Sequence, residues 1–80
     1  MDMQLIYLYD LKAKNKRDFN RVKRRFYYHL NKLRGPKLSF LTKSVMLVSP
    51  EREKIFDAFF KQFKGGLEVY KIWCEEISEL

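Results

Sequence analysis

The chain lacks the residues on which small disulfide-rich or zinc-binding domains depend. Its one cysteine, Cys74, can form neither an internal disulfide nor a paired-cysteine metal site. No stretch approaches the ~20 apolar residues that span a bilayer. The N-terminus also lacks the cationic start and apolar run of a secretory signal. These absences predict a reduced, cytoplasmic setting and no membrane partner.

The sequence also offers no familiar set of nucleophilic catalytic residues. His29 is the only histidine, and no serine or cysteine can be paired with it. We therefore expect His29 to be a packed or half-buried residue of a helix. Cys74 has no identifiable activating partner and is expected in the core part of a strand. Gly65 and Gly66 stand outside any phosphate-loop pattern. Catalysis by a side-chain nucleophile is therefore not predicted.

Large aromatic side chains, in contrast, are abundant. The 80 residues include seven Phe, five Tyr and one Trp. A chain of this length makes one domain and buries a modest fraction of its surface, so an additional interface would stabilise it. No repeat or linker divides the sequence, and residues 1–80 are predicted to form a single domain.

Positive charge is concentrated in one segment. The chain carries a net charge of +7, and residues 12–43 hold twelve of the seventeen basic residues with one acid, Asp18. This asymmetry favours a polyanionic partner, with nucleic acid first and an anionic membrane surface second. A solvated helix face is the alternative. The residues that we expect to bind phosphates are Lys12, Lys14, Lys16, Arg17, Arg21, Arg24 and Arg25.

The first half of the chain is predicted to form a strand followed by a helix. Residues 3–9 (MQLIYLY) are apolar at both alternating sets of positions, which predicts a strand covered on both faces. Asn15 is predicted to cap the helix together with Asp18, and Gly35 and Pro36 are predicted to end it. The apolar stripe of this helix consists of Phe19, Val22, Phe26, Leu30 and Leu33.

The second half repeats the alternation of strand and helix. Residues 38–49 form one bent strand or two short ones. Ser49 and Pro50 are predicted to begin a second helix, with the serine hydroxyl as its cap, and Gly65 and Gly66 to end it. Residues 67–74 are the last predicted strand. The broad apolar face of the second helix is predicted to consist of Ile55, Phe56, Phe59, Phe60 and Phe63.

This order of elements predicts an α+β fold. Right-handed crossovers produce a ferredoxin-like βαββαβ sandwich, with two helices on one face of an antiparallel sheet. The other sheet face would then be open. Apolar residues divide between both faces of the first and last strands, so we expect the open face to be buried in a homodimer.

Two short motifs carry a resemblance to a known family. The first strand reads Tyr9-Asp10, a basic helix follows, and a middle strand carries Ser44-Val45. These features resemble the CRISPR-associated protein 2 family, with Met46 where its Ser-Val-Phe signature has phenylalanine. The resemblance spans residues 3–73. It implies a ferredoxin-like homodimer that binds double-stranded DNA, contacts an integrase partner and serves the acquisition of foreign DNA.

The resemblance also implies a metal-dependent endonuclease, in which the strand-end aspartate binds Mg²⁺. Asp10 is thus the candidate catalytic and metal-binding residue, with Tyr9 and Ser44 as neighbours. One aspartate is too few for a firm Mg²⁺ site, but a two-fold dimer could bring two copies of Asp10 together. Alternatively, Asp10 ends the strand and starts a turn. A stand-alone ribonuclease toxin of similar fold and a non-catalytic basic nucleic-acid-binding domain remain alternative functions.

Overall fold

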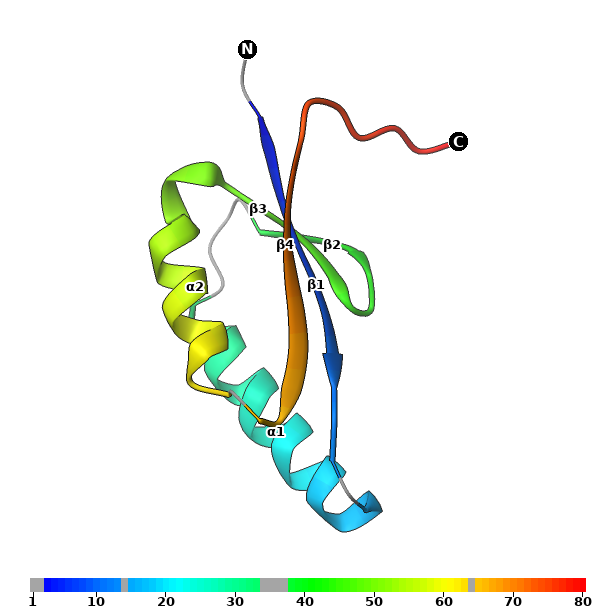
Figure 1. Cartoon of the computed structure of the whole chain (residues 1–80), viewed down its shortest axis with the longest axis vertical. Coiled ribbons are helices and arrows are strands. Elements are labelled where there is room, and N and C mark those ends of the chain that lie inside the picture. Colours follow the sequence, from blue (N-terminus) through cyan, green and yellow to red (C-terminus); the bar gives the residue numbers. More distant parts are fainter. Residues whose placement is uncertain (1–2, 14, 34–37, 64) are drawn as a thin grey trace.

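The computed structural model describes residues 3–13, 15–33, 38–63 and 65–80. A four-stranded antiparallel sheet has the strand order β2-β3-β1-β4. Figure 1 shows the elements, which are β1 (Gln4–Leu11), α1 (Lys16–Leu33), β2 (Ser39–Thr42), β3 (Val45–Val48), the short 3₁₀ helix η1 (Pro50–Arg52), α2 (Glu53–Lys61) and β4 (Leu67–Cys74).

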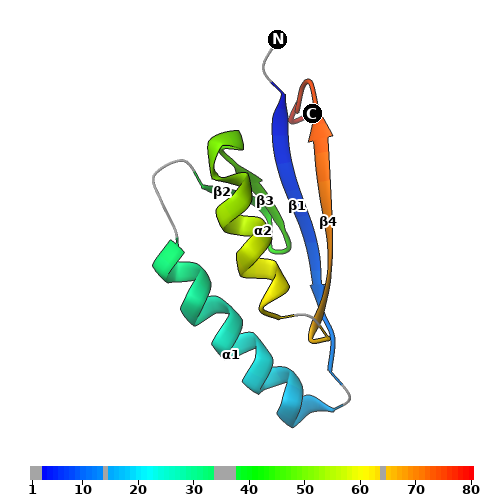
Figure 2. The same cartoon turned by 60° about the vertical axis from the view of Figure 1, so that its left-hand side comes forward.

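Both helices lie on the same face of the sheet (Figures 1 and 2). α1 connects β1 to β2, with β3 between them, and α2 connects β3 to β4, with β1 between them. The two β-α-β units therefore interleave, and every neighbouring pair of strands is antiparallel. The predicted α+β, ferredoxin-like class is confirmed. Within the described residues, neither helix has the length and apolarity needed to cross a bilayer.

The register of β1 determines which side chains face the helices. Leu5, Tyr7 and Tyr9 are buried on the helix side, and the alternate residues, including Asp10, face the open side. β1 continues through Leu11, two residues beyond the predicted segment. Asp10 consequently lies inside the strand and does not start a turn, so that alternative is wrong.

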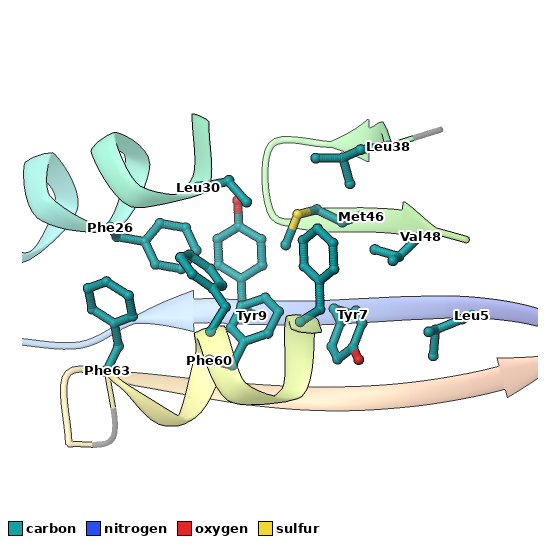
Figure 3. Close-up of a cluster of buried hydrophobic side chains, with 12 residues drawn as sticks. Leu5, Tyr7, Tyr9, Phe26, Leu30, Leu38, Met46, Val48, Phe60 and Phe63 are labelled. Atoms are coloured by element: carbon teal, nitrogen blue, oxygen red, sulfur yellow. The ribbon is translucent and has the colours of Figure 1, made fainter. Parts of the chain in front are cut away.

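Aromatic rings from both layers make up the core (Figure 3). The ring of Tyr7 lies 5.0 Å from that of Phe60, and the rings of Phe26 and Phe59 are 5.2 Å apart. Such aromatic pairs contribute roughly 0.5–1.5 kcal/mol beyond the burial of their area. Ile55, predicted on the apolar face of α2, is instead 46% exposed.

The predicted start of α1 is confirmed in detail. The backbone N–H of Asp18 donates to Asn15 Oδ1 at 2.9 Å, and Asn15 Nδ2 donates to Asp18 Oδ2 at 3.2 Å. This reciprocal pair satisfies a donor that the first helical turn would otherwise leave free. The predicted end at Gly35 and Pro36 lies outside the described residues.

α2 begins differently from its prediction. The side chain of Ser49 makes no capping hydrogen bond, and the chain instead enters through η1, where Arg52 N–H donates to the Ser49 carbonyl at 2.9 Å. The C-terminal prediction is confirmed. Gly65 has a φ of +94°, which favours glycine, and Gly66 N–H donates to the Phe63 carbonyl at 2.8 Å.

Residues 38–49 form two strands, β2 and β3, joined by a turn at Lys43 and Ser44. Ser44 is thus a turn residue, whereas the sequence placed it in the middle strand. The turn is fixed to β1, since the backbone N–H of Tyr9 donates to the Ser44 carbonyl at 3.0 Å. This contact places the turn beside the end of β1 that carries Asp10.

Candidate nucleic-acid interface

The outward side of α1 carries a row of arginines. Arg17, Arg21 and Arg24 follow at spacings of four and three, which place them on one line of a helix, and Tyr28 continues that line. All four side chains are exposed, and the three guanidinium groups form no ion pair within the described part of the chain. Figure 2 shows α1 at a margin of the helix layer. These arginines are therefore accessible to phosphates.

Two further cations flank this row and contact aromatic rings. The Arg25 guanidinium lies 5.7 Å from the centroid of Phe63, and the Lys32 ammonium lies 4.4 Å from that of Tyr28. The hydrogen bond and the positive charge of Lys32 lower the pKa of the Tyr28 hydroxyl. Because the Tyr28 ring is 58% exposed, it could stack on a nucleotide as well as pack beside Lys32.

Lys12, Lys14 and Lys16 are the three remaining residues that were predicted to bind phosphates. Lys16 is the first residue of α1 and is exposed. Lys12 Nζ forms an ion pair with Asp10 Oδ2 at 2.9 Å, and this hydrogen bond raises the pKa of Lys12. Its charge is therefore partly compensated. Lys14 lies outside the described residues.

Lys43, the last cation of the basic segment 12–43, lies in the turn between β2 and β3. The Tyr9 hydroxyl donates to the Lys43 carbonyl at 3.0 Å and lies 3.1 Å from the Tyr27 hydroxyl on α1. These bonds fasten the turn between β2 and β3 to α1. The Lys43 side chain is exposed.

Tyr9 and Ser44, the predicted neighbours of Asp10, line the same surface hollow as Asp10, although the bonds described above hold the Tyr9 hydroxyl on the helix side. Its ring is buried on the helix side of the sheet, whereas the Asp10 side chain is on the open side. Burial raises the pKa of the Tyr9 hydroxyl, which therefore stays protonated and available as a donor. Tyr9 fixes the neighbouring turn from within the core, and its hydroxyl does not join Asp10.

Asp10 faces a second carboxylate that the sequence did not reveal. It is paired with Glu68 of β4, so both side chains lie on the open face. They line a hollow of about 200 Å³ together with Leu8, Tyr9, Ser44 and Tyr70. Glu68 is far from Asp10 along the chain, and only the register between β1 and β4 brings the two together.

This hollow offers limited but chemically suitable ligands for a divalent cation. Asp10 and Glu68 supply the hard oxygens that Mg²⁺ prefers, and Mg²⁺ commonly keeps several waters and binds substrate phosphates. The described residues contain no group of three or more metal-binding side chains. The donors therefore fit a weakly held ion, which would have to compete with the Lys12 ammonium for Asp10.

The open sheet face is apolar over most of its width. Tyr70 is 60% exposed, and Leu8 and Ile72 are about two-fifths exposed. No helix covers this face (Figure 1). Cys74, expected in the core, is half-buried at its edge. The apolar residues of this open face are Ile6, Leu8, Val45, Leu47, Tyr70 and Ile72.

His29 is half-buried in α1, with its ring 6.2 Å from that of Phe63, which agrees with its predicted packing role.

No family model, curated protein or solved structure matches the chain. Function therefore has to be inferred from the chemistry of these surfaces.

Proposed function

We propose that the protein binds double-stranded DNA through α1 and that it does so as a homodimer. The observation that supports this most strongly is the exposed row of Arg17, Arg21 and Arg24, which forms no ion pair among the residues that the structure describes. Such a row contacts phosphates without reading bases. The resemblance to the CRISPR-associated protein 2 family adds a role in the acquisition of foreign DNA, beside an integrase partner in the cytoplasm.

The open face supports the homodimer. Soluble monomers rarely leave a wide apolar patch in water, and one face of a sheet can pair with its own copy about a two-fold axis. Burying Tyr70 and Ile72 in this way would also enlarge the small core of an 80-residue chain. The helix layers, with α1 in each, would then lie on the two outer sides of the dimer.

Binding of labelled duplex DNA, measured by fluorescence anisotropy over a series of salt concentrations, tests the role of α1. The double variant Arg21→Glu with Arg24→Glu should weaken binding by more than about tenfold at low salt, since it reverses two phosphate contacts. Lys54→Glu, an equal change per site on the exposed side of α2, is the control and should alter affinity much less. Equal losses in both variants would contradict the assignment to α1.

Metal-dependent cleavage is a second candidate function, favoured by the pairing of Asp10 with Glu68 across β1 and β4. These two carboxylates would hold Mg²⁺, which would polarise a phosphate and lower the pKa of a bound water. Asp10→Ala should abolish Mg²⁺-dependent cleavage with the fold intact by circular dichroism. Undiminished cleavage would remove Asp10 from any catalytic role.

The substrate of such cleavage distinguishes the remaining alternatives. Cleavage of single-stranded RNA in preference to duplex DNA would favour the ribonuclease toxin. Binding of duplex DNA with no cleavage in Mg²⁺ would leave a non-catalytic DNA-binding dimer. The Asp10→Ala protein should still bind duplex DNA in either case, because the arginine row of α1 is unchanged.

A further inference from the structure

Tyr28 is an exposed aromatic side chain that the proposed dimer leaves in water. Within the described residues, two aromatic side chains are more than half exposed, Tyr28 at 58% and Tyr70 at 60%. Tyr70 lies on the open face and would be buried between two copies of the chain. Tyr28 belongs to α1, in the helix layer on the other side of the sheet, so dimerisation through the open face does not cover it.

Cations border Tyr28 on both sides along α1. Arg24 lies four residues before it and Lys32 four residues after it, so the three residues follow one another on the same side of the helix. The Lys32 ammonium lies 4.4 Å from the ring centroid, and the His29 ring lies 5.3 Å away at an angle of 80°. The Tyr28 ring is largely accessible despite these two contacts. The only acid of α1, Asp18, is in the first turn, so α1 offers a polyanion positive charge on both sides of this ring.

An aromatic ring within a line of cations suits a nucleotide whose base is unpaired. The cations attract phosphates, and the ring offers a surface on which any base can stack. Bases inside a duplex are stacked on their neighbours, so an external ring does not reach their faces. Arg17 and Arg24 are about 10 Å apart along the helix axis, which corresponds to about three base pairs, and Tyr28 lies about 6 Å further on. The arginines can therefore hold a short stretch of duplex, while Tyr28 contacts a nucleotide that follows it.

We propose that Tyr28 stacks on an unpaired base at the point where a DNA duplex continues as a single strand. This role of Tyr28 rests on the proposed function, the binding of duplex DNA by α1, and it names the DNA that α1 prefers. The arginine row contacts phosphates of the duplex. The Tyr28 ring, with the Lys32 ammonium over one face, receives the unpaired base on the other face. The identity of the base is not read, because every base has a face that can stack.

Matched DNA probes separate stacking from charge. One labelled duplex is left blunt, extended by a few unpaired adenosines, or extended by the same number of abasic nucleotides, and the extensions are tested at both strand polarities. The abasic extension has the same phosphates and no bases. By fluorescence anisotropy, the protein should bind the adenosine extension at least about fivefold more tightly than the abasic extension in one polarity or both. This ratio should persist as salt rises, because stacking releases no counterions.

Variants of the full chain localise the preference. Tyr28→Ala should reduce the ratio of the two affinities to about one, whereas Tyr28→Phe should preserve it because the ring is kept. Asn31→Ala, at an exposed position one turn further along α1, is the control and should also preserve the ratio. A fluorescent adenine analogue beside the duplex end gives a second measurement. Its emission should be quenched by the wild type and by Tyr28→Phe, and much less by Tyr28→Ala.

Equal affinity of the wild type for the adenosine and abasic extensions would overturn the proposal, and so would a ratio that Tyr28→Ala retains. Tighter binding of the unpaired strand alone than of the extended duplex would overturn it as well. Failure of the proposed function has a different pattern, in which the Arg21→Glu, Arg24→Glu protein binds the blunt duplex as well as the wild type does. If that variant loses the blunt duplex while the two extensions bind the wild type equally, α1 binds duplex DNA and Tyr28 has no part in choosing it.

Discussion

The Tyr7 hydroxyl joins three elements at a single point. The residue is in β1, its hydroxyl donates to Asp57 of α2, and Asp57 also accepts from Lys71 of β4. Burial, together with the adjacent carboxylate of Asp57, raises the pKa of Tyr7, so the hydroxyl remains a donor. A hydrogen bond to a charged acceptor contributes about 1.5–3 kcal/mol.

Tyr7→Phe should therefore lower the free energy of unfolding by about 1–2 kcal/mol, because Asp57 retains Lys71 as a partner. Urea denaturation measures the loss. Tyr28→Phe is the matched control, since the Tyr28 side chain is largely exposed on α1 and lies outside the open face. A loss of equal size in both variants would show that the hydroxyl of Tyr7 has no special role.

The same contacts make stability depend on pH. Burial opposes ionisation of Asp57, but hydrogen bonds from Tyr7 and Lys71 outweigh it and lower the pKa of this carboxyl. A carboxyl whose folded pKa is lowered stabilises the fold above its unfolded pKa, and this contribution is lost as pH falls through the folded value. Unfolding free energies measured from pH 6 down to pH 2 should therefore fall less steeply for Asp57→Asn than for the wild type. Identical slopes would contradict this linkage.

Individual site residues were only partly predictable from the sequence. Asp10 and the arginines of α1 stand out because their type and spacing have a chemical meaning without the fold. Glu68 does not stand out, because its possible role as a second carboxylate depends on the strand register that places it opposite Asp10. Tyr9 and Ser44, which the resemblance gives as neighbours of Asp10, line the same hollow, but the strand period turns the Tyr9 side chain to the opposite face.

At the scale of the elements, the N-terminus of α1 depends on a short local motif. Asn15→Ala removes the acceptor for Asp18 N–H and should lower the unfolding free energy by about 1 kcal/mol. Asn20→Ala, at an exposed position inside the same helix, should be neutral or slightly stabilising because alanine has the higher helix propensity. Thermal unfolding of both variants checks the difference. Destabilisation by Asn20→Ala alone would contradict the capping role.

Elements were predicted best where a local signal marks their ends. The cap at Asn15 and the stop at Gly65 depend on residues within a few positions, and both are confirmed. The end of β1 has no such signal, because its extension to Leu11 is fixed by pairing with Leu67. The division of residues 38–49 also had to come from the structure, because no Asn-Gly or Asp-Gly pair marks the turn at Lys43 and Ser44.

At the scale of the whole molecule, the proposed homodimer would determine how many arginine rows are available to bind DNA. The arginine row lies in the helix layer, and the open face is on the other side of the sheet. A dimer through the open face would carry two arginine rows, so one DNA molecule could contact both. The number of phosphates neutralised sets the slope of binding affinity against salt concentration.

Ile72→Glu should make the protein monomeric, because it puts a charge at the middle of the open face, opposite Ile6. If the dimer binds duplex DNA with both rows, the slope of log affinity against log salt should fall to about half in this variant. Ile55→Glu, at an exposed apolar position of α2, is the control and should change neither assembly nor slope. Sedimentation velocity measures assembly, and anisotropy at several salt concentrations measures the slope. An unchanged slope in a monomeric Ile72→Glu protein would mean that a single α1 makes all the phosphate contacts, and the dimer would then have no part in DNA binding.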